Sequence, residues 1–202
     1  SGSNDTGVGA TCPPPVAGPN TVRARKLTCK ADLPTGAMAA ARVGDIVLEN
    51  HLVRFVLRTG KDGEATLGLV GGNIIDAVRI GKDGKQQGGD SLREWIPTVA
   101  FHLVTPADVT ILSDGSNGEA RVRIAGDLVP FQTVHAFLPI DKPNLKVFHE
   151  YVLKPGASSL EIRTSATPTD GQVDTSLIGD VTFWGGRLGL FRPGSGDPES
   201  NF

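Results

Sequence analysis

Short runs of apolar and β-branched residues recur from residue 45 onward, and each run is bounded by residues that favour turns. This spacing predicts strands, because half-buried strands alternate with turn residues in all-β proteins. The predicted strands are residues 46–48, 52–57, 66–70, 73–80, 109–112, 120–124, 131–138, 145–153, 159–165, 177–183 and 187–191. Residues 95–104 are also apolar but include Pro97, which indicates an edge strand or an irregular crossing. Residues 37–41 favour one helical turn at most.

The connections between these runs favour antiparallel strands. Residues 114–118, Asp-Gly-Ser-Asn-Gly, are the clearest hairpin signal, and residues 139–143 and 154–156 also have turn chemistry. Strands do not alternate with helices as in a parallel sheet, and no period typical of a propeller is visible. We therefore predict an all-β fold, an antiparallel β-sandwich or flattened barrel with short turns and little helix.

The N-terminal part of the chain differs in composition. Residues 1–21 are rich in Gly, Pro, Thr and Asn, so we expect residues 1–43 to form an extended lead and residues 44–202 a single β-sandwich domain. Cys12 and Cys29, the only cysteines, can form a disulfide that ties the lead to the first strands, or remain free thiols. The first residues resemble the tether that follows the lipidated cysteine of a lipoprotein, or a short tag remnant. The chain stops after a turn, so it ends in an exposed tail or belongs to a longer protein.

The composition of the chain excludes several classes of protein. With 26 Gly and 14 Pro among 202 residues, a helical bundle is excluded. A chain with 39% hydrophobic and 21% charged residues is too apolar to be disordered. The net charge of −2 offers no basic surface for nucleic acid. No apolar run approaches the roughly 18 residues of a transmembrane segment.

Several short motifs resemble a family of secreted or lipid-anchored surface proteins from myxobacteria and similar deltaproteobacteria. They are residues 44–50 with 53–57, 71–77, 89–94, 150–156 and 178–186. The resemblance implies an extracellular, periplasmic or outer-surface location, an N-terminal lipid anchor, and a first domain within a longer chain. The strand after residues 150–156 also resembles galactose-mutarotase-like domains, which implies a wide sandwich of two large sheets. The family implies no catalytic residue here.

Two histidines are candidates for chemistry. If the predicted strands 131–138 and 145–153 pair, His135 and His149 can face each other across the sheet. Glu161 or Asp90 would then supply a carboxylate, and such a group suits a transition metal or an acid–base pair in sugar chemistry. Alternatively, each histidine is a half-buried strand residue bonded to a backbone carbonyl.

The polar stretch 88–95 contains two carboxylates, Asp90 and Glu94. They could hold Ca²⁺ together with backbone carbonyls, or Asp90 could cap a helical turn while Arg93 and Glu94 pair with neighbours. Trp95 and Trp184 could stack on sugar rings from exposed positions. Alternatively, and as the low aromatic content favours, they are core indoles whose N–H groups bind carbonyls.

Three functions remain open, and no cofactor is predicted. No phosphate-binding loop or nucleophile elbow is present in the sequence. The first hypothesis is a non-enzymatic extracellular or surface-anchored module for surface structure, adhesion or assembly, with another surface protein docking by strand addition. The second is glycan binding, and the third is a sugar epimerase or lyase. Glycan binding would draw on Trp95 or Trp184 together with Arg93, Glu94, His135 or His149, and the enzyme would use His135 or His149 with a carboxylate.

Overall fold

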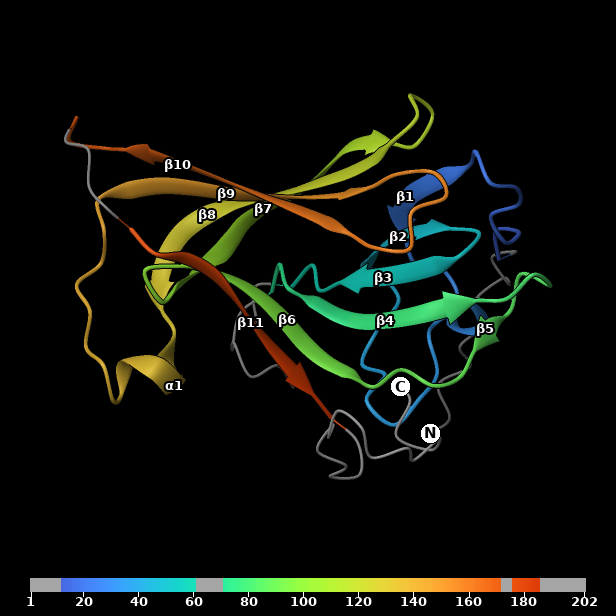
Figure 1. The fold of residues 1–202 in the computed structure, drawn as a ribbon, viewed down its shortest axis with the longest axis horizontal. Helices are drawn as coiled ribbons and strands as arrows, with labels where there is room; N and C mark the ends of the chain where they lie inside the picture. Colours follow the sequence, from blue (N-terminus) through green and yellow to red (C-terminus); the bar gives the residue numbers. More distant parts are fainter. Residues whose placement is uncertain (1–11, 61–70, 172–175, 186–202) are drawn as a thin grey trace, which may run out of the picture.

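Antiparallel β-strands dominate the computed structural model, which describes residues 12–60, 71–171 and 176–185 (Figure 1). The strands are β1 Val22–Lys26, β2 Ile46–Asn50, β3 Val53–Leu57, β4 Ile74–Ile80, β5 Gln86–Gln87, β6 Leu92–Val99, β7 His102–Asp114, β8 Ala120–Pro130, β9 Leu145–Leu153, β10 Glu161–Pro168 and β11 Ile178–Trp184. Two helical turns accompany them, the 3₁₀ turn η1 Lys30–Asp32 and the helix α1 Gln132–His135. The predicted all-β antiparallel fold is confirmed.

The strands form one open sheet in the order β1-β2-β3-β4-β6-β7-β8-β9-β10, with β11 added to β6 and β5 added to β4. The sheet folds over, so that β1 and β2 contact β7, β8 and β9 as a second layer (Figure 1). The main core fills the space between the layers. It combines alternate residues of both parts, such as Leu48 and Phe55 from one and Val122 and Tyr151 from the other. This is sandwich packing, in which each strand turns every second side chain inward.

The outer face of β2, β3 and β4 is covered as well. The loop between β1 and β2, residues 27–45, folds back over this face, and we call it the strap. Its base is closed by two backbone bonds, Leu27 N to Asp45 O (2.8 Å) and Gly44 N to Leu27 O (2.8 Å). A second apolar cluster lies beneath it, made of Leu27, Leu33, Ala40, Ala41, Val47, Val56 and Ile75. All five residues of β2 are therefore buried.

A buried glutamate joins the strap to the sheet. Glu49 on β2 is 2% exposed and accepts hydrogen bonds from Arg23 Nη2 (2.7 Å), Arg25 Nε (2.9 Å) and Arg54 Nη2 (2.6 Å). Arg25 and Arg54 also pair with Asp32 of η1, within the strap. Burial alone would raise the pKa of Glu49, but Arg54, Arg25 and Arg23 outweigh it and hold the pKa below the ordinary value. The glutamate is therefore ionised and fully partnered.

Asn50 connects the two layers. Its Nδ2 donates to Lys154 O (3.0 Å) and Ala157 O (2.7 Å) in the β9–β10 turn. Its Oδ1 accepts from Leu52 N (2.8 Å) and Val53 N (3.0 Å), which shapes the tight β2–β3 turn. The side chain is 2% exposed, so these partners replace water completely.

Most predicted strands are present, with shifted ends. The hairpin at residues 114–118 is confirmed, and its strands β7 and β8 are longer than predicted. β9 covers residues 145–153 as predicted. The predicted strands 66–70 and 187–191 lie outside the described residues. Cys12 and Cys29 form the disulfide, with 5.7 Å between their Cα atoms.

Four local features differ from the predictions. Residues 131–138 contain α1 instead of a strand, because Phe131 and Val134 lie three residues apart and pack together against one outer cluster. Residues 95–104 hold a tight turn, in which Ala100 and Phe101 have φ of 48° and 56° without glycine. The lead contains β1, which was not predicted, and residues 37–41 form no helical turn.

Replacing Glu49 should strongly destabilise the protein. In Glu49→Ala, three guanidinium groups lose their shared acceptor in a partly buried site, which typically costs about 3–5 kcal/mol of unfolding free energy. Urea denaturation measures this difference. The control is Glu119→Ala, because Glu119 makes a half-exposed pair with Arg121 at 3.6 Å, worth about 0–1 kcal/mol. Equal losses in both variants would contradict the structural role of Glu49.

Asn50→Ala should lower the unfolding free energy by about 2–4 kcal/mol, because it leaves buried backbone donors and acceptors of two turns without partners. The same denaturation experiment tests this. Asn117→Ala at the exposed hairpin tip should change stability by less than about 0.5 kcal/mol. A loss below about 1 kcal/mol for Asn50→Ala would mean that water replaces these bonds.

Candidate functional site

The ladder between β6 and β11 brings together four of the six ligand-binding candidates, Arg93, Glu94, Trp95 and Trp184. The two strands run side by side in Figure 1. Thr182 lies opposite Trp95, and after a bulge Trp184 lies opposite Leu92. Because β6 and β11 are about 80 residues apart in sequence, this grouping depends on strand register.

The four side chains have different environments. Glu94 is fully buried and accepts a hydrogen bond from Asn73 Nδ2 (2.9 Å). Trp95 is half-buried against the main core. Arg93 is exposed, and Trp184 is 61% exposed. Arg93 and Trp184 are thus the two members of the group that solvent or a ligand can reach.

β11 has an open backbone edge. Ala100 N donates to Leu177 O (2.7 Å), so the backbone groups of Leu177 point toward β6. Successive strand residues turn their N–H and C=O groups to opposite sides, so those of Ile178, Asp180 and Thr182 point away from β6. Pro97 lies opposite Asp180, where β6 donates no hydrogen bond to β11, and proline is tolerated there. Within the described ranges, no strand pairs with this edge.

Exposed apolar side chains accompany this edge. Ile178 lies opposite Val99 and Trp184 opposite Leu92, and both β6 residues belong to the main core. Residues directly opposite each other share a face of the sheet. Ile178 and Trp184 therefore point to the core side of the sheet, yet Ile178 is 54% and Trp184 61% exposed. Within the described residues, no strand covers the core at this edge.

The two candidate histidines lie on separate elements and do not face each other across the sheet. The predicted pairing required residues 131–138 to be a strand, but His135 is in α1. Its Nε2 lies 3.2 Å from Ile140 O, and its ring contacts the buried ring of His102, with centroids 6.2 Å apart. His149 lies on β9, where its Nδ1 is 2.9 Å from Thr164 Oγ1 on the neighbouring strand.

His149 is a neutral core residue. It is 3% exposed, and burial lowers its pKa from 6.5 to about 4. Its Nε2 is also buried and has no hydrogen-bond partner. Protonation would place an unpaired charge inside the sandwich, so the imidazole stays uncharged at neutral pH. It contributes to packing instead.

Asp90 neither caps a helix nor lies on the surface. It is 1% exposed and precedes β6, and its Oδ1 accepts from Ala77 N (2.9 Å) and Leu92 N (3.3 Å). No helical turn follows it, so the predicted capping role is wrong. Its close neighbour is Asp76 of β4, which the sequence analysis missed. A charged residue inside the apolar run Ile74–Ile80 was the available signal.

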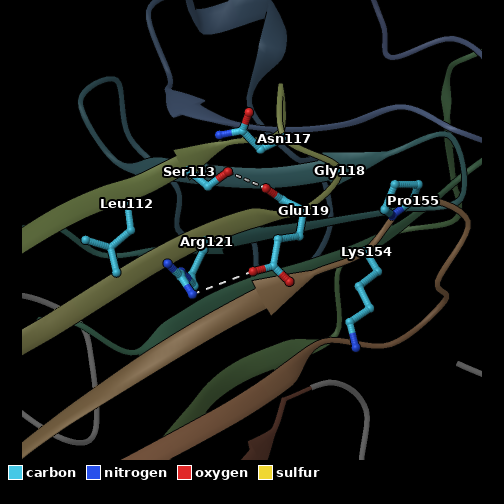
Figure 2. Close-up of a pocket in the computed structure, with 8 residues that line it drawn as sticks. All are labelled: Leu112, Ser113, Asn117, Gly118, Glu119, Arg121, Lys154 and Pro155. Atoms are coloured by element: carbon cyan, nitrogen blue, oxygen red, sulfur yellow. Dashed lines mark hydrogen bonds and ion pairs between the residues drawn. The ribbon is translucent and has the colours of Figure 1, made fainter.

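A shallow hollow of about 380 Å³ lies elsewhere, at the tip of the β7–β8 hairpin (Figure 2). Its wall carries two cations, and each is paired with a carboxylate. Arg121 Nη1 lies 3.6 Å from Glu119 Oε1, and Lys154 Nζ lies 3.2 Å from Glu161 Oε2. With its charges balanced, the hollow favours neither an anion nor a cation.

Comparison of the chain with protein-family models, with curated proteins and with solved structures found no match. In the part of the chain that the structure describes, no group of three metal-ligating side chains is found. None of the helices in that part is long and apolar enough to cross a membrane. The features that bear on function are therefore the all-β sandwich and its β6–β11 edge.

The lowered pKa of His149 makes stability depend on pH. The folded state resists protonation and the unfolded chain does not, so this contribution is complete above pH 6.5 and is lost as pH falls toward 4. Between pH 7 and 4, the parent should lose about 3 kcal/mol more than His149→Gln. Denaturant titrations at both pH values measure this. His51→Gln, in the β2–β3 turn, should behave as the parent does, and equal losses in His149→Gln would contradict the prediction.

Proposed function

We propose that this chain is a non-enzymatic extracellular or surface-anchored β-sandwich module that assembles with another surface protein by strand addition to β11. The observation that carries the proposal is the open edge of β11. Its outward backbone groups at Ile178, Asp180 and Thr182 are ready to pair with an extended segment. The exposed side chains of Ile178 and Trp184 lie on the core side and would be buried by that segment.

The proposed partner is an extended segment with apolar residues at alternate positions. A strand added to β11 turns every second side chain toward the core side, where Ile178 and Trp184 would contact it. An exposed edge with apolar side chains is otherwise a risk of aggregation, which natural sheets avoid with charges, prolines or coverage. Asp180 is the single charged side chain of β11. A covering partner accounts for an edge of this kind.

The cellular location is part of the same proposal. The disulfide Cys12–Cys29 supports an oxidising compartment, because cytoplasmic thiols are kept reduced. The resemblance of residues 44–50 and 150–156 to secreted surface proteins supports export, an N-terminal lipid anchor and a place within a longer chain. The proposed location is therefore extracellular, periplasmic or on the outer surface.

Glycan binding is the second candidate, and one observation favours it. Trp184 and Arg93 are both exposed at the β6–β11 ladder, and an indole and a guanidinium are groups that contact sugars. The sugar-acting enzyme has less support, because His135 and His149, which it was to combine, bind separate partners.

A proline substitution at the open edge of β11 distinguishes strand addition from other modes of binding. A photo-cross-linking residue at Thr182, in cells that produce the protein, should capture one defined protein. Asp180→Pro removes an outward N–H without touching the bonds to β6, and it should reduce this adduct at least about tenfold. The matched control, Asp180→Ala, removes the same side chain but keeps the N–H, and should retain the adduct.

The contrary outcomes are equally specific. Absence of any protein adduct from Thr182, or equal adducts in Asp180→Pro and Asp180→Ala, would overturn strand addition. A cross-linker at Lys146, exposed on β9, controls for chance encounters. Binding to a glycan array that disappears in Trp184→Ala but persists in Asp180→Pro would favour the glycan-binding candidate.

A further inference from the structure

Two carboxyl groups are buried side by side beneath the strap. Asp76 on β4 is 0% exposed, and Asp90 ahead of β6 is 1% exposed. Each uses its Oδ1 to accept backbone hydrogen bonds, Asp76 from Ala40 N of the strap (2.8 Å) and Asp90 from Ala77 N (2.9 Å). The Oδ2 atom of each carboxyl is buried and has no hydrogen-bond partner.

The backbone of Asp90 holds the same part of the strap. Asp90 N donates to Thr35 O (2.8 Å), and Met38 N donates to Asp90 O (3.3 Å). The strap passes so close that a Cβ on Gly36 would overlap the backbone of Asp90. The strap is thus bound to this pair through residues 35, 38 and 40.

The surrounding charges are already engaged or exposed. Arg58 from the β3 end donates to Ala40 O (2.7 Å) and lies 3.6 Å from Asp45 Oδ2. Arg54 on β3 binds Glu49, and Glu94 on β6 accepts from Asn73. The side chains of Arg79, Lys85 and Arg93 are exposed. In the described part of the chain, neither carboxyl of the pair forms an ion pair with a cation.

Two buried carboxylates without a cation cannot both be ionised at low cost, because like charges repel strongly where water is absent. A single proton removes both the repulsion between the charges and the lack of a hydrogen-bond donor. It neutralises one acid, and it turns that acid into a donor for the free oxygen of the other. The two neighbouring carboxyls, each with a buried oxygen that lacks a partner, therefore favour a shared proton.

We propose that Asp76 and Asp90 share one proton and form an acid-stabilised latch that holds the strap, residues 27–45, on the sheet. Loss of this proton leaves two buried negative charges directly under the strap. The strap then loosens, because opening it exposes both charges to water. The latch is closed in acidic surroundings and weakens as the pH rises from about 4 to about 7.

The direction of the pH dependence follows from the titration of the pair. Burial raises the pKa of Asp76 to about 7, the bond from Ala40 N opposes this, and the charge of Asp90 raises the pKa further. Burial also raises the pKa of Asp90. The closed strap therefore binds the proton more tightly than the open strap, in which an aspartate has a pKa of about 3.9. Stability of the closed state is complete below pH 4 and declines until about pH 7.

Hydrogen exchange of the strap amides tests the latch in the intact protein. Protection factors of Ala40 and Met38 should fall by at least about tenfold between pH 5.5 and pH 8.5, while those of the β9 core amides stay constant. Titration of His149 does not interfere, because its pKa lies near 4 and its burial does not involve the strap.

Asp76→Asn is the decisive variant. The amide keeps an oxygen for Ala40 N and supplies a permanent N–H donor for Asp90, so it copies the protonated acid at every pH. Protection of Ala40 and Met38 should then be high and independent of pH. Asp127→Asn makes the same chemical change at an exposed site on β8 and should keep the pH dependence of the parent.

Two results would overturn the latch. One is strap protection in the parent that does not change with pH, and the other is Asp76→Asn with the pH dependence of the parent. If Asp76→Asn fails to fold, Asp90→Asn carries the same test from the other side of the pair. Carboxyl carbon chemical shifts of the parent give a readout without substitution, since two ordinary titrations near pH 4 would exclude a shared proton.

Discussion

The fold depends on the bonds between Glu49 and the arginines of β1 and β3. A buried carboxylate is costly without partners, and Glu49 has three guanidinium groups within 2.9 Å. These bonds fix β1 as the first strand and, through Asp32, place the strap over the outer face. The strap then covers Val47, Val56 and Ile75, so that β2 and β3 are buried on both faces. One ion network thus converts a Gly- and Pro-rich N-terminal region into a layer of the domain.

The opposite end of the molecule is shaped by the corner at β6. This strand meets β4 only at Ile74–Trp95 and β7 only at Val99–His102, whereas β11 pairs with it from Leu92 to Val99. Because the sheet folds over at this corner, β7 passes into the second layer and β11 is left outside as an edge strand. The tight turn at Ala100 and Phe101 makes the fold-over possible, at the cost of two residues in the left-handed region. The open edge is thus a consequence of the architecture.

The elements that could be predicted are those specified by residues close together in the sequence. The Asp-Gly-Ser-Asn-Gly turn at residues 114–118 and the apolar run 145–153 were recognisable from the sequence, because turn residues and β-branched residues act within a few positions. β1, Val22–Lys26, was not recognisable from the sequence. Its arginines are accommodated in a strand because Glu49 lies opposite on β2, and this pairing is not a local signal. The grouping of the candidate site residues could not be predicted for the same reason. The sequence pointed to Arg93, Trp95 and Trp184 one by one, but their grouping depends on a register between strands about 80 residues apart.

The strap and the end of β11 are physically connected. Gly185, at the end of β11, has no room for a side chain because Met38 of the strap fills that position. Met38 is also bonded to Asp90 O, and Gly185 N donates to Ser91 O (3.0 Å), so the carboxyl pair, the strap and the end of β11 meet within a few residues. A strap that loosens withdraws Met38 from Gly185, next to Trp184. Under the two proposals, the proton on the carboxyl pair and a partner bound to β11 beside Trp184 would be linked, and each would change the affinity for the other by the same factor.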